Sequence, residues 1–163
     1  MADTFDYCVR HGILGVGWRT ETNISTTDWE AYYAEASTIH DNLNVCRYIR
    51  RRIETGSLVW TRDTQGNYYL ARVLSGWEYY ATDESRKNNI DIGNVFRVAL
   101  EKISLDEVPG KVVASFRATR SVQAIYDLTS REYSKFLWNR RSGQSTYAID
   151  ERVFTKPRHF RVA

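Results

Sequence analysis

The feature that most constrains the fold is a pair of strand-like segments joined by a short polar turn. The first segment, SLVWTRD, covers residues 57–63, and the second, YYLARVLSGWEYY, covers residues 68–80. Both are rich in the β-branched and aromatic residues that favour strands. The letters TQGN between them include Gly and Asn, which tolerate the backbone conformations that a tight turn needs. We therefore predict a β-hairpin over residues 57–80.

Other segments also predict strands, since they combine apolar residues with turn signals at their ends. They are YCVRHGILGVGW (residues 7–18), NVFRVALEKISL (residues 94–105) and, after the turn at Pro109–Gly110, KVVASF (residues 111–116). The polar segment TDESRKNNIDIG (residues 82–93) is expected to be a loop.

Helical spacing of apolar residues occurs in the segments 27–40, 44–56 and 129–143. The first and the last open with a Thr-x-x-Glu capping box, at Thr27 and at Thr129. The middle segment carries an arginine run on the face opposite its apolar stripe. Together with the strands, this order predicts an α+β fold: a strongly bent mixed β-sheet or small β-barrel flanked by helices.

The length of 163 residues is enough for one domain with a sizeable core. We expect a single domain over residues 1–163, with its core over about residues 8–140. The C-terminal tail is then a candidate junction with a further domain of a longer protein.

No stretch approaches the roughly 20 apolar residues of a membrane span, and the N-terminus lacks the pattern of a secretion signal. We therefore expect a cytoplasmic protein with no membrane partner. Cys8 and Cys46 are expected to be buried thiols, because disulfides are rare in that compartment. The histidines have no metal-ligand spacing with the cysteines or with one another, so we expect no metal and no cofactor.

Sequence motifs for catalysis are weak. The run GILGVG (residues 12–17) lacks the Lys-Ser/Thr of a P-loop and is followed by Trp18 and a polar segment. The chain has no Gly-x-Ser-x-Gly elbow, and no carboxylate cluster beside a lysine indicates a metal-dependent nuclease. We therefore predict a binding module rather than an enzyme.

Aromatic and basic residues are the most distinctive part of the composition. The chain has five Trp and eleven Tyr, and its net charge is +3 from 23 basic and 20 acidic residues. Arginines cluster in runs such as RYIRRR (residues 47–52), which suits phosphate contact but is also typical of a solvated helix face. Most Trp residues pack in the core. However, Trp18, Trp60 and Trp77 each neighbour a glycine or a basic residue, which makes them candidate walls of a base-stacking pocket.

Three blocks of the chain resemble the EVE domains of the PUA-like superfamily, which also includes the YTH domains. The blocks are GVGWRTETNISTTDWEAYY (residues 15–33), IRRRIETGSLVWTRDTQGNYYLARVLSGWEYY (residues 49–80) and SFRATRSVQAIYDLTSREYSKFL (residues 115–137). Ser57 stands where the family usually has an acidic residue, and Ala71-Arg72 replaces a glycine pair. The resemblance implies a bent β-barrel with a pocket for a single base, often a modified one. It also implies a DNA reader of a modification-dependent restriction system, working with a nuclease or an NTPase.

The resemblance implies that Trp18 and Trp77 are the main walls of the base pocket, with Trp60 as a third ring. The remaining pocket positions are Tyr79 and Ser121, although strand alternation also sends one of Tyr79 and Tyr80 into the core. The resemblance also implies that Arg117, Arg120 and Ser121 lie near the pocket rim, where the family has an arginine-serine motif. We assign phosphate contacts to Arg117 and Arg120, and to Arg19 and Arg62, which directly follow or nearly follow Trp18 and Trp60 in the sequence.

We therefore predict a reader that swings a methylated or hydroxymethylated base out of a DNA duplex and into an aromatic pocket. Arginines at the mouth would hold phosphates without reading sequence. RNA is an alternative target. Two other classes of function stay open: a nucleotide-processing enzyme that uses the same pocket, and a protein-interaction module whose exposed aromatic residues bind a partner.

Overall fold

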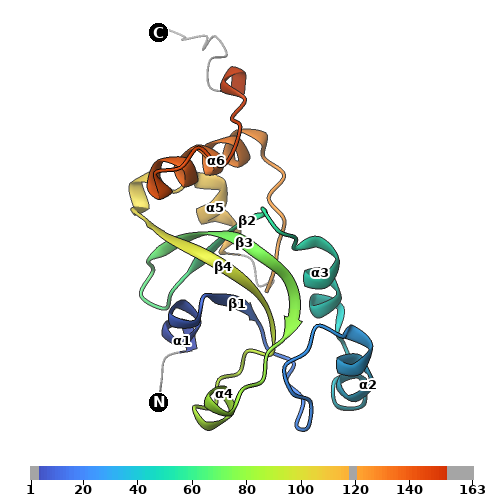
Figure 1. Ribbon diagram of the computed structural model, residues 1–163. Helices are drawn as coiled ribbons and strands as arrows, with labels where there is room; N and C mark the ends of the chain where they lie inside the picture. The colour runs from blue at the N-terminus through green and yellow to red at the C-terminus, as the bar shows by residue number, and fades with distance from the viewer. Residues whose placement is uncertain (1–3, 118–120, 154–163) are drawn as a thin grey trace, which may run out of the picture.

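The computed structural model describes residues 4–117 and 121–153. Four strands form one sheet in the order β1-β4-β3-β2, and helices pack against both of its faces (Figure 1). The strands are β1 (Ile13–Val16), β2 (Leu58–Arg62), β3 (Tyr68–Tyr79) and β4 (Asn94–Ile103). All pairings between these strands are antiparallel, so the sheet is not mixed.

The predicted hairpin is confirmed. Strands β2 and β3 pair from Leu58 opposite Arg72 to Arg62 opposite Tyr68. The turn between them is closed by Asp63, whose Oδ1 accepts hydrogen bonds from the backbone N–H groups of the two residues Gln65 and Asn67. Strand β2 is thus an edge of the sheet, as β1 is at the other end.

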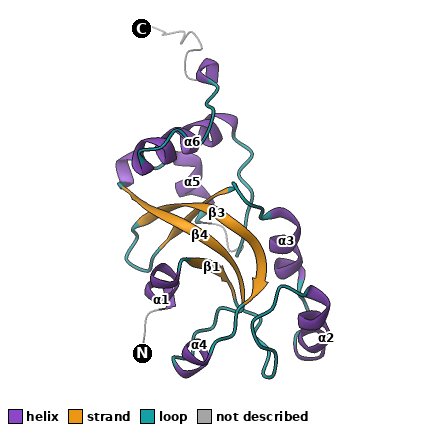
Figure 2. Cartoon of the chain, in the orientation of Figure 1, coloured by secondary structure: helices purple, strands orange, loops and turns teal. Residues whose placement is uncertain are grey.

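Strand β3 bends strongly along its 12 residues (Figure 2). Its register with β4 shifts between Val73 and Ser75 and again between Ser75 and Glu78. Irregularities of this kind insert residues into one strand, which increases the local twist and bends the sheet. The predicted α+β class, with a strongly bent sheet flanked by helices, is therefore confirmed.

The helices partly depart from the sequence expectations. They are α1 (Thr4–His11), α2 (Trp29–Ile39), α3 (Asn44–Arg52), α4 (Asp83–Lys87), α5 (Gly110–Ser115) and α6 (Leu128–Ser142), with short 3-10 turns at Leu105–Glu107 and Glu151–Val153. The strand predicted over residues 7–18 is wrong in its first part, which is α1. The strand predicted over residues 111–116 is also wrong, because this segment is α5, and the expected loop over residues 82–93 contains α4.

Both wrong strands are short apolar runs, and periodicity alone does not separate helix from strand in such runs. Helix α5 begins after Pro109, whose ring fixes φ and whose carbonyl accepts a hydrogen bond from the backbone N–H of Val112. Val112 then packs in one cluster with Leu137 of α6. Helix α1 ends at His11, and φ is 63° at the following Gly12, so the chain turns before β1 begins.

Helices α2 and α6 are confirmed, but the residues that cap them differ from those predicted. Asp28 caps α2, since its Oδ1 accepts from the backbone N–H groups of Glu30 and Ala31. Asp127 caps α6 by accepting from the backbone N–H of Ser130. An aspartate directly before the helix outcompetes the predicted Thr-x-x-Glu pair in both cases.

The core has a cluster on each face of the sheet. Strands β1, β3 and β4 pack with α2 and α3 in the first cluster, which includes Tyr32, Ile49 and Val73. On the opposite face, β3 and β4 pack with α5 and α6 through residues that include Leu70 and Leu137. A smaller cluster joins α1 to the start of β4. The sheet is therefore enclosed between helices except along its edge strands.

A buried hydrogen-bond network ties the ends of the sheet together around Asn94, which is 0% exposed. The Asn94 Nδ2 group donates to the carbonyl of Gly17 (2.9 Å) and to the Tyr32 hydroxyl (3.0 Å). Its Oδ1 accepts from the indole N–H of Trp77 at 2.8 Å. Tyr32 donates in turn to the carbonyl of Trp18 at 2.7 Å. Burial raises the pKa of Tyr32 far above its usual range, so this hydroxyl stays a neutral donor.

We predict that Asn94→Ala lowers the free energy of unfolding by about 2–4 kcal/mol, because it removes these bonds and leaves buried polar groups without partners. Urea denaturation of the variant and the parent measures the difference. The control is Asn23→Ala, which removes an exposed amide contact. A loss of stability no larger for Asn94→Ala than for this control would contradict the role of the network.

Candidate functional site

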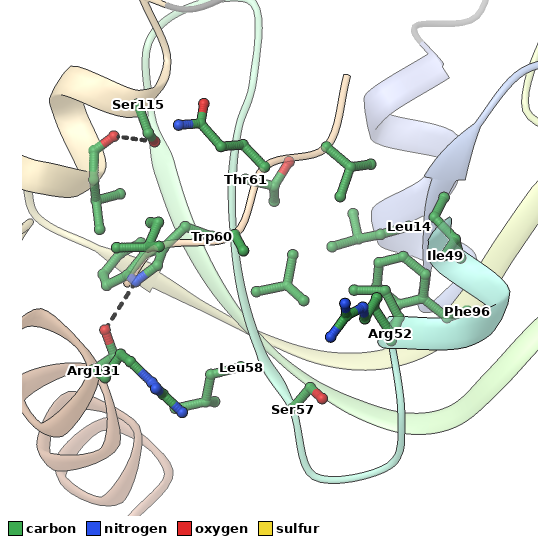
Figure 3. Close-up of a pocket in the computed structure, with 18 of the residues that line it drawn as sticks. Leu14, Ile49, Arg52, Ser57, Leu58, Trp60, Thr61, Phe96, Ser115 and Arg131 are labelled. Atoms are coloured by element: carbon green, nitrogen blue, oxygen red, sulfur yellow. Dashed lines mark hydrogen bonds between the residues drawn. The ribbon is translucent and has the colours of Figure 1, made fainter. Parts of the chain in front are cut away.

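A cavity of about 620 Å³ lies along the β2 edge of the sheet (Figure 3). Its walls come from β1, β2, α3, the start of α6 and the segment 121–126. Successive side chains of a strand point to opposite faces. Both Val59 of the first core cluster and Trp60, from the opposite face, line the cavity. The cavity therefore follows the edge of the sheet between the two clusters.

Trp60 is held in one orientation at this edge. Its indole N–H donates to Ser134 Oγ of α6 at 3.0 Å, and the Ser134 hydroxyl donates to the Ser130 carbonyl at 2.7 Å. The ring is partly exposed, whereas Ser134 is buried. A partly exposed aromatic ring with a fixed N–H presents a flat apolar face to a ligand without further ordering.

The charged side chains among the described residues that line the cavity are all basic. Arg52 of α3 and Arg131 and Lys135 of α6 line it, and the described lining residues include no Asp or Glu. Lys135 pairs with Glu132 at 2.8 Å. Neither arginine forms an ion pair within residues 4–117 and 121–153. Cations without carboxylate partners create a local field that attracts anions.

Tyr147 forms a second aromatic wall, and its position is fixed from two directions. Its hydroxyl donates to the Gly56 carbonyl at 2.7 Å. Its backbone N–H donates to the Asn139 side chain, and its carbonyl accepts from the same side chain. Tyr126 lines the mouth and is 85% exposed, so its ring is available to a ligand. Rigid and accessible aromatic groups thus occur together along this cavity.

The structure brings only some of the predicted pocket residues together. Trp60 and Ser121 line the cavity, whereas Trp18, Trp77 and Tyr79 do not. Trp77 is 8% exposed and bonded to Asn94, and Tyr79 is 1% exposed. Trp18 packs against the first core cluster in a left-handed backbone conformation, with φ 58°. Trp77 and Tyr79 are therefore parts of the core, whereas Trp18 is partly buried against it.

The predicted phosphate-binding arginines do not line the cavity in the part of the chain that the structure describes. Arg19 donates to the carbonyl of Ile90 at 3.0 Å, and Arg62 stacks over the Phe116 ring at 5.0 Å. Arg117 is exposed. Arg120 lies outside the described residues.

Sequence reasoning missed the cations that do line the cavity. Arg52 belongs to the RYIRRR cluster, which indicated basic character but not which arginine faces a pocket. Arg131 and Lys135 are four residues apart, so they share one face of the predicted helix, and this spacing was the available signal. Their approach to β2 depends on how α6 packs, which the local sequence does not determine.

Other groups relevant to chemistry lie away from the cavity. Cys8 and Cys46 are both buried thiols, and burial raises the pKa of Cys46 to about 11. Among the residues that the structure describes, no group of three or more His, Cys, Asp or Glu side chains is placed to hold a metal ion. No described helix is long and apolar enough to cross a membrane.

Comparison with family models, curated proteins and solved structures found no match to the chain. The functional argument therefore depends on the geometry of the cavity. The EVE-like resemblance stays a prediction from the sequence.

The wall that α6 forms depends on ionised carboxylates, so we predict that it is acid-sensitive. The hydrogen bond from Lys135 and the backbone N–H of Asp150 hold the pKa of Glu132 below its usual range. The hydroxyl and backbone N–H of Ser130 do the same for the pKa of Asp127. A carboxyl group whose pKa is lower in the folded protein than in the unfolded chain stabilises the fold when it is ionised. For these two groups the stabilisation is present above about pH 5 and is lost as the pH falls below about 4.

Glu132→Gln is expected to lower the urea midpoint at pH 6 and to make its decline between pH 6 and pH 3 shallower than in the parent. The exposed Glu54→Gln substitution is the matched control. A pH dependence in Glu132→Gln identical to that of the parent would rule out this role of the carboxylate.

Proposed function

We propose that this protein is a nucleic-acid-binding domain that receives one nucleotide in the cavity between β2, α3 and α6. The observation that carries the proposal is the composition of the cavity: Arg52, Arg131 and Lys135 line it together with the fixed Trp60 ring, and its described lining residues include no carboxylate. The basic side chains are suited to binding phosphates, and the flat face of the Trp60 ring is suited to stacking on a base. The volume of about 620 Å³ lies within the range of ligand pockets.

The base stacks on Trp60 in this proposal. Stacking on an aromatic side chain contributes about 1–3 kcal/mol per base, which offsets much of the few kcal/mol needed to swing a base out of a duplex. Hydroxyls and amides along the walls, such as Ser57, Thr61 and Gln123, supply hydrogen-bond partners for the base edge. Trp60 takes the place of Trp18 and Trp77 as the stacking ring in this proposal, since neither of those two rings lines the cavity.

The finer part of the proposal is that the base is a methylated or hydroxymethylated base in DNA. Apolar side chains from both core clusters reach the cavity, among them Leu14 and Val59 of the first and Val112 of the second, and they offer a surface for an added methyl group. Burying one methyl group contributes only about 0.8 kcal/mol. Strong discrimination therefore also requires displacement of ordered water or exclusion of other substituents.

The EVE-like resemblance adds a biological setting to this proposal. We propose that the domain directs a nuclease or NTPase effector to modified DNA, as the targeting part of a restriction system. Binding without chemistry is the expected behaviour. Incubation with nucleotides and with modified DNA, in the presence of magnesium or manganese, should therefore give no product.

We predict that Trp60→Ala weakens binding to the preferred duplex by about 5- to 150-fold, which corresponds to the loss of 1–3 kcal/mol of stacking. The measurement is fluorescence anisotropy with labelled duplexes that differ in one central base: cytosine, its 5-methyl and 5-hydroxymethyl forms, adenine and N6-methyladenine. The variant should also lose the preference among these duplexes.

Trp60→Phe is the matched variant, because it keeps a stacking ring while removing the N–H that bonds Ser134. Its affinity should lie between those of the parent and of Trp60→Ala. Circular dichroism and urea denaturation confirm that each variant is folded. If folded Trp60→Ala binds the preferred duplex as tightly as the parent, the cavity is not the base-binding site.

A further inference from the structure

Two arginines face the cavity from opposite sides and from different helices. Figure 3 shows Arg52 of α3 on one side and Arg131 of α6 on the other, with Leu58 of β2 between them. Both side chains belong to exposed residues. Neither has an ion-pair partner in the described part of the chain. The cavity is therefore flanked by two separate guanidinium groups that are available to anions.

Each arginine is carried by a well-anchored helix. Arg52 is the last residue of α3, whose Ile49 is fully buried in the first core cluster. Arg131 follows Ser130, which is buried and bonded to the capping Asp127. Guanidinium groups on rigid elements lose less freedom on binding than groups on mobile loops.

The two arginines lie at opposite ends of their helices. Arg52 is in the last turn of α3, where a cation is favourable for the helix dipole. Arg131 lies one turn after the capping residue Asp127 of α6 and lines the cavity. The cavity is therefore approached by the C-terminal end of one helix and the N-terminal end of another.

We propose that Arg52 and Arg131 bind the two phosphates that flank the inserted nucleotide on the same strand. This inference rests on the proposed function. A nucleotide within a strand has one phosphate on each side of its sugar, and the guanidinium group is suited to paired hydrogen bonds with phosphate oxygens. The cavity then recognises a nucleotide inside a chain, and a free nucleotide, which lacks the second phosphodiester, binds weakly.

The first test measures affinity and salt dependence for Arg52→Gln, Arg131→Gln and the double variant. The probe is the duplex of the panel above that the parent binds most tightly. Each single variant should bind about tenfold more weakly, and the two effects should multiply in the double variant, since separate phosphates are involved. The slope of log affinity against log salt should become shallower by about 0.9 for each lost phosphate contact.

The matched control is Arg51→Gln, which removes the same charge one residue away from Arg52 in a side chain that does not line the cavity. Its effect on affinity should be clearly smaller than that of Arg52→Gln. Equal effects of the two substitutions would indicate general electrostatic attraction and would overturn the proposal.

The second test assigns each arginine to one phosphate. Duplexes carry a neutral methylphosphonate at the phosphate either 5′ or 3′ of the central base. On one of these duplexes, Arg52→Gln should have the same affinity as the parent, whereas Arg131→Gln should still bind more weakly. On the other duplex, Arg131→Gln should match the parent and Arg52→Gln should bind more weakly. The two-phosphate arrangement is wrong if both variants match the affinity of the parent on the same modified duplex. It is also wrong if both variants bind more weakly than the parent on each of the two duplexes.

The outcomes separate this inference from the proposed function. If Trp60→Ala loses binding while both arginine variants bind like the parent, only the two-phosphate site fails. If the arginine variants behave as expected but Trp60→Ala binds normally and the parent has no base preference, the base pocket fails, and the arginines remain phosphate contacts without an inserted nucleotide. A parent protein that binds none of the duplexes would overturn both.

Discussion

The bent sheet depends on the buried amide of Asn94 at the start of β4. Its three hydrogen bonds reach Trp77 in β3, Tyr32 in α2 and the backbone of Gly17 after β1. A buried amide is tolerated only when its donors and acceptor are satisfied, so these elements are held in one mutual arrangement. The bond to Gly17 fixes the point at which the chain leaves β1, and the bond to Tyr32 fixes how α2 packs on the sheet.

The same arrangement leaves β2 as an open edge and makes the cavity. The sheet bends so that its two edge strands, β1 and β2, both line the cavity, and α3 and α6 contribute further walls. Side chains from both faces of the sheet meet there, together with the cations of two helices. The Ser134 hydroxyl holds Trp60 at this edge, as Asn94 holds Trp77 in the core. Each indole is therefore fixed in place by a hydrogen bond to a buried residue, one at the cavity and one in the core.

Long patterns in the sequence predicted much of the fold. The hairpin, α3, β4 and α6 were recognised because each has enough residues for its periodicity and its turn or stop signals to agree. Helices α1 and α5 were missed because a short apolar run fits either a helix or a strand. In α5, the packing of Val112 with Leu137 of α6 stabilises the helical conformation. For the candidate site, Trp60 and Ser121 were predicted, but the cations that line the cavity were not.

By itself, the sequence determined the bent α+β class, the hairpin, the arginine-rich helix α3 and the abundance of aromatic rings. Only the tertiary structure decided which of those rings and charges share a cavity. Trp60 contacts Ser134 across 74 positions of the chain, and Trp77 contacts Asn94 across 17. The exposure of a side chain depends on which distant element packs over it, and a local pattern carries no information about that packing.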